Sequence, residues 1–457
     1  MAAGIPVRQG VTKTTRQAMD TTRDGALAAA AAVRAGEITA VELVQAALDR
    51  IAEFEPQVAA WTHLDPELAL ERAREADERR RRGEPTGPLH GVPVGIKDII
   101  DTADLPTECG TVLHAGRRPA RDAAIIATLR EAGAIILGKT VTTELAVYAP
   151  GNTRNPHNYE RTPGGSSSGS AAAVAAYMVP LAVGSQTNGS VIRPASYCGV
   201  YGFKPSFGRI SRHGVLEISR PLDTLGVFAR DLEDLALLSD TLMVYDQRDP
   251  DMRPLARPGI SAIMGAAPPV EPRLAFIRAP AWERAEQTTK DAFRELCEHL
   301  GDRVDMVDLP RMFDEALDTH RIIMEADLAK NTAKLYQDGA TQLSERLREM
   351  IESGQRVLAT EYNTARERSG EYAAIIDELM NDYDAILTPA ATGEAPGYET
   401  TGDPAFCTIW SLCGVPSLNL PILQGPAGMP LGAQLVAAKG DDARLFRTAR
   451  WLVESLQ

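Results

Sequence analysis

Two loops rich in glycine and serine carry the side chains best suited to chemistry in this chain. They span residues 162–170 (TPGGSSSGS) and 183–195 (VGSQTNGSVIRPA). Glycine lets a backbone adopt conformations closed to other residues and approach a ligand closely. The strongly apolar run between the loops, 171–183, predicts that both are anchored at the edge of a core. They are therefore not flexible linkers, and their serines are candidate nucleophiles.

A serine nucleophile needs a base, and the base that this sequence offers is a lysine. No histidine lies in or beside the two loops. Lys97 lies in the apolar, β-branched stretch 91–100 (GVPVGIKDII), where burial would disfavour its charged form. A neutral Lys97 could accept a proton. The structural alternative is an ion pair with Asp98 or Asp101, and the chemistry alone favours neither interpretation.

Two short motif matches point to other functions. Residues 133–140 (GAIILGKT) match a phosphate-binding loop, but the four middle residues are typical of a buried strand, so we interpret this match as accidental. Residues 165–169 (GSSSG) match the nucleophile elbow of α/β-hydrolases, centred on Ser167. That elbow needs an apolar strand directly before it, whereas NYERTPG is typical of a loop. An esterase with Ser167 as nucleophile is kept as an alternative.

The cysteines and histidines suggest neither a metal site nor disulfides. Cys198 could be a thiol nucleophile, but a lone cysteine in an apolar context is more often buried and inert. No histidine or cysteine cluster has metal-ligand spacing, so we expect no metal and no cofactor. The five cysteines are odd in number and form no C-x-x-C pair, which favours a reducing compartment.

Composition and charge indicate a soluble globular protein. The chain has 457 residues, of which 44% are hydrophobic and 24% charged. Its formal net charge of −14 would be repelled by a phosphate backbone, so we expect no nucleic-acid partner. The N-terminus lacks the apolar segment of a signal peptide. The longest apolar run, 171–184, is shorter than the roughly 20 residues of a membrane span. We expect a cytoplasmic protein with no membrane contact.

The pattern of elements predicts an α/β fold. Helical periodicity covers 25–54, with Thr39 as a helix cap, and 67–82. Strands and helices then alternate, which is typical of a layered α/β core. The expected strands are 91–100, 134–137, 179–183, 383–389 and 417–423, and the expected helices are 122–132, 171–178 and 442–454. Residues 254–362 read as mostly charged amphipathic helix without a recognisable motif.

Three of these segments together resemble the amidase signature family. They are 89–111 (LHGVPVGIKDIIDTADLPTECGT), 163–176 (PGGSSSGSAAAVAA) and 184–206 (GSQTNGSVIRPASYCGVYGFKPS). The order and spacing of the three are more specific than any one alone. The resemblance extends from about residue 25 to the end of the chain and is loose over 254–362.

The resemblance implies a Ser-Ser-Lys triad. Lys97 matches the family's lysine, Ser166 the bridging serine that follows a cis peptide bond, and Ser190 the nucleophile. The separation of 24 residues between Ser166 and Ser190 agrees with the family pattern. Ser167 and Ser185 would support the triad through hydroxyl hydrogen bonds. The oxyanion hole would consist of the backbone amides of Thr187, Asn188, Gly189 and Ser190.

This chain departs from the family pattern at two positions. Most members have glycine where this chain has Asn188, a residue that tolerates left-handed backbone angles better than other non-glycine residues. Arg193 stands three residues after Ser190, where many members have arginine two residues after the nucleophile. The second variant resembles malonamidase-type members, in which the arginine holds a substrate carboxylate. The alternative is that Arg193 braces the loop internally.

The resemblance implies a fold and a function. The fold would be a mixed central β-sheet flanked by helices, with an arm at 1–24, a single domain at 25–457, and a helical insertion at 254–362 that roofs the pocket. The function would be that of a serine amidohydrolase that cleaves the C–N bond of small amides or carbamates through an acyl-enzyme, without a cofactor. The alternative from another class is an amidotransferase component of the A type that works in a complex. A homodimer is left open.

Overall fold

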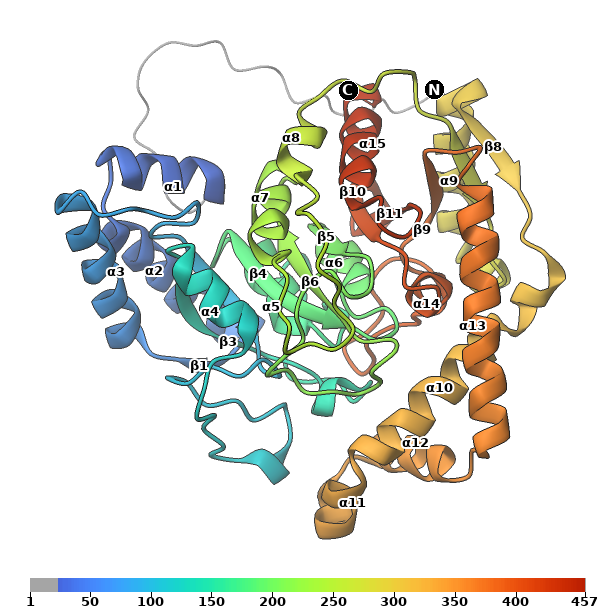
Figure 1. Ribbon diagram of the computed structural model, residues 1–457, viewed down its shortest axis with the longest axis horizontal. Helices are drawn as coiled ribbons and strands as arrows, with labels where there is room; N and C mark the ends of the chain where they lie inside the picture. Colours follow the sequence, from blue (N-terminus) through green and yellow to red (C-terminus); the bar gives the residue numbers. More distant parts are fainter. Residues whose placement is uncertain (1–23, 457) are drawn as a thin grey trace.

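The computed structural model describes residues 24–456, so nearly all of the expected arm at 1–24 lies outside the described residues. An eleven-stranded mixed sheet runs through the described part of the chain (Figure 1). Its strands are β1 (Trp61–Leu64), β2 (Pro93–Lys97), β3 (Ile135–Thr140), β4 (Leu181–Gln186), β5 (Tyr201–Lys204), β6 (Thr224–Ala229), β7 (Leu274–Ile277), β8 (Val304–Val307), β9 (Ala385–Pro389), β10 (Ser417–Gln424) and β11 (Pro430–Val436).

The strand order places the two predicted loops beside the lysine strand. The order is β1-β3-β2-β4-β6-β5-β10-β11-β9-β7-β8. β2 lies between β3 and β4 and is parallel to both, so the carboxyl ends of all three strands meet at one edge. Lys97 is the last residue of β2, and the second glycine-rich loop leaves the end of β4.

Helices cover both faces of the sheet. They are α1 (Ala26–Ala35), α2 (Ala40–Val58), α3 (Pro66–Arg81), α4 (Ala124–Glu131), α5 (Ser168–Ala175), α6 (Ile192–Cys198), α7 (Leu232–Leu242), α8 (Ile260–Met264), α9 (Gln287–Leu300), α10 (Ala316–Asn331), α11 (Ala333–Gly339), α12 (Glu345–Gln355), α13 (Ala359–Leu379), α14 (Ala405–Leu412) and α15 (Asp442–Ser455). Short 3-10 turns lie between several of them.

The alternation of side chains along β4 divides the core into two layers. Leu181 and Val183 belong to a large cluster that includes residues of α4, α7, α8 and α15. Ala182 points the other way, into a second cluster with residues of α2, α3, α5 and α6. Both clusters are buried, which explains why these strands read as continuous apolar runs instead of alternating ones.

Local capping explains where the N-terminal helices begin. Thr39 accepts a hydrogen bond from the Glu42 backbone N–H at 3.1 Å, and the Glu42 carboxylate accepts one from the Thr39 backbone N–H at 2.8 Å. This reciprocal pair is a capping box. The predicted helix start at Thr39 is therefore confirmed.

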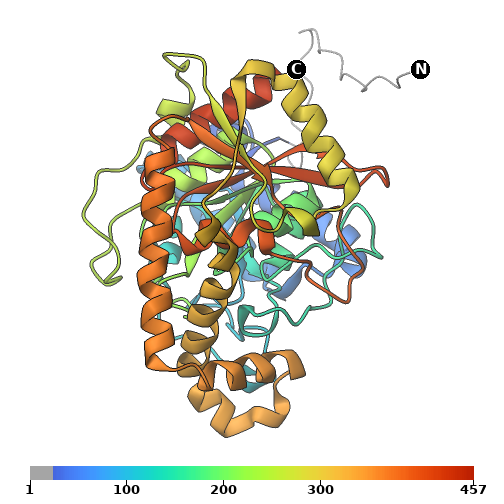
Figure 2. The same ribbon diagram turned by 90° about the vertical axis from the view of Figure 1, so that its right-hand side faces the viewer.

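The expectation for 254–362 is wrong in part. Besides helices, this segment contains β7 and β8, which pair in parallel with each other, while β7 also pairs with β9. The segment thus extends the central sheet. Its remaining helices, with α13, run beside the sheet, and α11 and α12 project from the body at the lower end of both views (Figures 1 and 2).

Candidate active site

Lys97 lies at the centre of a cluster of serine hydroxyls. Its side chain is fully buried, and Nζ donates to Ser166 Oγ at 2.6 Å and to Ser185 Oγ at 2.8 Å. The positioning follows from the strand geometry, because β2 ends at Lys97 beside the strand that ends just after Ser185. The structure therefore brings together three residues that lie 69 and 88 positions apart in the chain.

The ion-pair alternative for Lys97 is wrong. Asp98 pairs instead with Lys139 of β3, at 3.0 Å. Asp101 accepts two hydrogen bonds from the guanidinium of Arg117, at 2.7 and 2.9 Å. Both carboxylates are thus paired with other cations, and the partners of the Lys97 amine are hydroxyls.

Burial lowers the pKa of Lys97 well below its ordinary value, because the ammonium loses its hydration. The negative charge of Asp223 opposes this shift, and the positive charge of Arg193 adds to it. A lysine that loses its proton easily and touches a serine hydroxyl is arranged to act as a general base.

Ser166 and Ser167 follow each other at the start of α5 but have different surroundings. Ser166 comes directly after a cis Gly165–Ser166 peptide bond and lines a cavity. Ser167 is fully buried. Its hydroxyl donates to the Ser185 carbonyl at 3.1 Å and accepts from the Ser185 N–H at 3.2 Å. Ser167 thus fastens the end of β4, and this geometry does not support the esterase alternative in which Ser167 is the nucleophile.

Ser190 shares the cavity with Ser166. The cavity has an empty volume of about 330 Å³. Its lining residues are Ala146, Val147, Tyr148, Ser166, Thr187, Asn188, Ser190, Arg193, Ile218, Met324 and Thr401. Within residues 24–456, no protein group hydrogen-bonds to the Ser190 hydroxyl, which leaves it available to a ligand.

The loop that carries Ser190 is fastened at its start and its end. The Thr187 hydroxyl donates to Asp223 at 2.6 Å. Gln186 accepts from the backbone N–H groups of Val191 and Ile192 at 2.9 and 3.0 Å. By contrast, none of the backbone N–H groups of 187–190 donates to another group in the described part of the chain. The predicted oxyanion donors are therefore unoccupied.

The backbone at Asn188 does not have the left-handed conformation that the glycine of related sequences suggested. Its φ is not among the positive values of the chain. Its side chain instead braces the loop, since Nδ2 donates to the Tyr148 hydroxyl at 2.9 Å and Oδ1 accepts from Thr408 at 2.7 Å. Nothing in the sequence pattern indicated Tyr148 or Thr408 as partners.

Arg193 is 1% exposed and has features of both predicted roles. Nε donates to the Thr401 carbonyl and Nη2 to the Gly165 carbonyl, each at 2.7 Å. These bonds brace the two glycine-rich loops, as the internal alternative requires. However, Nη1 is buried without a hydrogen-bond partner, and Arg193 lines the cavity that holds Ser190. One donor thus remains for a ligand.

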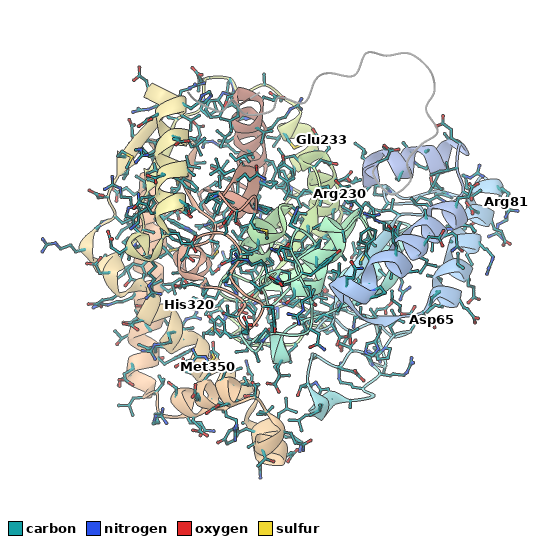
Figure 3. All side chains as sticks on the ribbon, turned by 180° about the vertical axis from the view of Figure 1, so that it is seen from behind. Asp65, Arg81, Arg230, Glu233, His320 and Met350 are labelled. Atoms are coloured by element: carbon teal, nitrogen blue, oxygen red, sulfur yellow. The ribbon has the colours of Figure 1, made fainter. Side chains whose placement is uncertain are left out.

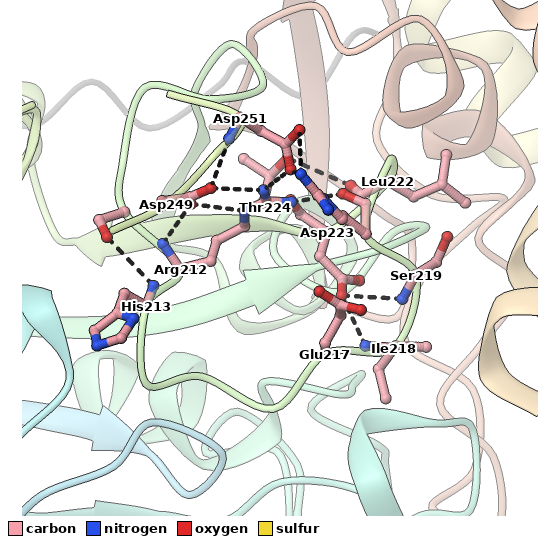
Figure 4. Close-up of polar contacts among 12 residues, drawn as sticks. Arg212, His213, Glu217, Ile218, Ser219, Leu222, Asp223, Thr224, Asp249 and Asp251 are labelled. Carbon is pink, nitrogen blue, oxygen red and sulfur yellow. Dashed lines mark hydrogen bonds and ion pairs between the residues drawn. The ribbon is translucent and has the colours of Figure 1, made fainter. Parts of the chain in front are cut away.

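A second cavity lies behind the loop, on the side of Asp223 (Figure 4). Asp223 also accepts from the backbone N–H groups of Ile218 and Ser219, and burial raises its pKa to about 6. Beside it, Arg212 pairs with Asp249 at 3.0 Å and with Asp251 at 2.5 Å. This charged network holds the segment that positions Asp223, which sequence reasoning did not identify.

The competing motifs have structural explanations. Residues 135–140 of the phosphate-loop match form β3, so the interpretation of that match as accidental is confirmed. Cys198 is fully buried, burial raises the pKa of its thiol, and Sγ contacts the Pro163 carbonyl at 3.4 Å. A thiol so held is a poor nucleophile.

The described residues offer neither a metal cluster nor a membrane span. Among residues 24–456, no three His, Cys, Asp or Glu side chains gather in a way that could hold a metal ion. No helix in the same range is long and apolar enough to cross a bilayer.

A mixed sheet that presents a lysine, two serines and a glycine-rich loop at one edge matches a known group of enzymes. The family model described as Amidase matches residues 42–446. The chain belongs to this family, as its resemblance to the amidase signature sequences suggested. Solved structures similar to it are also amidase-signature enzymes.

Curated relatives cover nearly the whole chain. The A-type component of the glutamyl-tRNA(Gln) amidotransferase of Chloroflexus aggregans is 36% identical over 464 aligned positions, which cover 92% of this chain and 94% of the relative. The protein of the same name from Salinispora arenicola is 35% identical and covers 94% and 96%.

Solved structures agree in fold. The native peptide amidase of Stenotrophomonas maltophilia has a TM-score of 0.83 at 28% identity, covering 95% of this chain and 97% of that one. A structure described as a vestigial protein complex, related to the origins of an s-triazine catabolic enzyme, has a TM-score of 0.89 at 27% identity and covers 94% and 98%.

Proposed function

We propose that this protein is a serine amidohydrolase that cleaves the C–N bond of small amides or carbamates through an acyl-enzyme. The observation that carries the proposal is the contact of 2.6 Å between Lys97 Nζ and Ser166 Oγ, in a cavity edge that Ser166 shares with Ser190. Family membership supports the reaction class. The roles of the three residues are our assignment.

The proton path begins at the neutral amine of Lys97. Lys97 takes the proton of Ser166, which takes the proton of Ser190 as the Ser190 oxygen attacks the substrate carbonyl carbon. The C–N bond then breaks, and Ser166 returns a proton to the leaving nitrogen. The acyl-enzyme is released when water, deprotonated by the same relay, attacks the ester carbonyl and frees the acid and Ser190. Lys97 is regenerated in its neutral form.

The negative charge on the carbonyl oxygen would be held by the backbone amides of 187–190. These donors need no reorganisation when the charge develops, which is where such sites gain most of their effect. Removing one donor of this kind typically costs about 100- to 1000-fold in turnover.

The substrate class follows from Arg193. An unpartnered guanidinium N–H in the cavity suits a carboxylate on the acyl side, as in a half-amide of a dicarboxylic acid. We therefore propose carboxylated amides ahead of neutral amides, anilides and carbamates. Ser166 and Ser190 alone would not discriminate among these, because the acyl transfer is the same for all.

Covalent labelling tests the proposal. A fluorophosphonate should react with Ser190, and mass spectrometry of the digest locates the adduct. Ser190→Ala should abolish labelling, whereas Ser196→Ala, which removes another buried serine, should leave it intact. Labelling at Ser167 or Cys198 would overturn the assignment.

A second candidate is favoured by the relatives, which are named as components of an amidotransferase. Such a component would pass ammonia from an amide donor to a partner protein. The purified chain alone, given an amide but no ATP and no partner, separates the two functions. Release of ammonia at rates typical of enzymes, about 1 per second or faster, supports the stand-alone hydrolase. Release that needs a partner supports the amidotransferase component.

A further inference from the structure

The carbonyl groups of the loop before Ser190 are held by side chains from distant helices. The Thr187 carbonyl accepts a hydrogen bond from His320 Nε2 at 2.9 Å. The Asn188 carbonyl accepts one from the Ser411 hydroxyl at 2.5 Å. His320 lies on α10 (Figure 3) and Ser411 on α14. The two tethers join residues 133 and 223 positions apart in the chain.

The next carbonyl is held by local structure. Gly189 accepts from the backbone N–H of Arg193 at 3.0 Å, a bond that begins α6. Three successive peptide carbonyls are therefore engaged, the first two by side chains and the third by a helix start.

Engaged carbonyls decide the direction of the N–H groups. In a trans peptide unit, the C=O and the N–H of the next residue point to opposite sides of the same rigid plane. Holding the carbonyls of Thr187 and Asn188 therefore aims the N–H groups of Asn188 and Gly189 away from the two tethers. These N–H groups have no acceptor within the described residues.

Both tethers are buried and supported. His320 is 1% exposed, and burial lowers its pKa to about 4, so the ring is neutral and Nε2 carries the proton that it donates. Ser411 is 2% exposed and also accepts from Gln186 Nε2 at 3.0 Å. Gln186 in turn holds the end of the loop through Val191 and Ile192.

We propose that His320 and Ser411 are positioning residues that aim the N–H groups of Asn188 and Gly189 at the oxygen that becomes negative during acyl transfer. They touch neither the substrate nor the reacting atoms. The inference rests on the proposed function, because it assigns work to an oxyanion hole. It also gives α10, in the segment for which the sequence showed no motif, a role in the reaction.

The test compares four variants of the full chain. His320→Phe removes the donor, and His320→Gln keeps an N–H in its place. Ser411→Ala removes the second donor. Ser369→Ala is the matched control, because Ser369 donates to the Leu412 carbonyl at 2.8 Å, at the end of the same helix but outside the loop.

Two assays separate positioning from general structural support. One is the second-order rate constant of fluorophosphonate labelling at Ser190, and the other is the kcat, KM and pH profile for p-nitrophenyl acetate. We expect His320→Phe and Ser411→Ala to lower the labelling rate and kcat by about 10- to 100-fold, less than loss of a donor itself. KM and the pH midpoint of Lys97 should stay unchanged. His320→Gln should recover to within about 3-fold, and Ser369→Ala should match the wild type.

The outcomes distinguish this inference from the proposed function. If the wild type is not labelled at Ser190, the proposed function fails. If the wild type is labelled but Ser411→Ala and a folded His320→Phe react at its rate, the inference fails. A loss that Ser369→Ala shares, or a shift in the pH midpoint, would also overturn it. Ser411→Ala changes a single hydroxyl and keeps the test decisive if His320→Phe does not fold.

Discussion

Replacing Arg193 by leucine should have two effects that the structure allows us to separate. The first is on stability, because the carbonyls of Thr401 and Gly165 lose their donors at a buried position. Each unsatisfied buried group costs about 1 to 3 kcal/mol, so the free energy of unfolding should fall by about 2 to 6 kcal/mol. That loss is a large part of an ordinary stability of about 5 to 15 kcal/mol.

The second effect is on selectivity. The Nη1 group is unpartnered in the cavity, and a charge-assisted hydrogen bond from it to a substrate carboxylate would be worth about 1.5 to 3 kcal/mol, or roughly 10- to 150-fold. Damage to the loops should affect all substrates alike, whereas loss of this bond affects only those with a carboxylate. The ratio of kcat/KM for two amides therefore isolates the Nη1 contribution.

The assay uses malonamate, which carries a carboxylate, and butanamide, which has similar size and is neutral. Ammonia release is measured for the wild type, Arg193→Leu and Arg193→Lys, together with thermal unfolding. We expect the malonamate-to-butanamide ratio to fall by roughly 10- to 150-fold in Arg193→Leu and by less in Arg193→Lys, which keeps a charge. An unchanged ratio, with both substrates slowed and unfolding easier, would refute the carboxylate role and leave the brace as the function of Arg193.

Three further predictions concern the base and the loop. Lys97→Ala and Ser166→Ala should each lower kcat by orders of magnitude, and the double variant should be little worse than the weaker single one, because both act in one relay; additive losses would argue against the relay. The kcat/KM of the wild type should rise with pH as Lys97 loses its proton, with a midpoint below the ordinary lysine value of about 10.4, since burial lowers its pKa. Asp223→Asn should move that midpoint to lower pH, because the carboxylate charge now raises the pKa of Lys97; a midpoint that moves upward would contradict the assignment of the base. Asn188→Gly should lower kcat and leave the midpoint unchanged, since it removes the two hydrogen bonds to Tyr148 and Thr408 that brace the loop; a kcat equal to that of the wild type would show that this brace is dispensable.

The sequence could predict most of the sheet near the site but not its far end. β2, β3 and β4 are apolar runs buried on both faces, so their composition alone marks them. β7 and β8 are four-residue strands amid charged helical sequence, too short to show a period of their own. They became strands because β9 offers β7 a free edge to pair with.

The partners of charged residues also needed the structure. From the sequence, Asp98 and Lys97 are adjacent, and an ion pair between them was as plausible as a neutral base. The parallel pairing of β2 with β3 places Lys139 opposite Ile96, where its amine reaches Asp98. Neighbouring residues of a strand point to opposite faces, which separates Lys97 from Asp98 and leaves the lysine to the serines.

The sequence by itself determined the chemical groups of the candidate site and the family, because Lys97, Ser166 and Ser190 lie in short motifs whose glycines and serines are recognisable without any distant contact. Only the tertiary structure decided how the loop before Ser190 is oriented. His320 and Ser411 have no local pattern around them, and each reaches the loop only after α10 and α14 have packed against it. Hydrogen bonds between residues so far apart depend on the packing of whole helices, which no short stretch of sequence encodes.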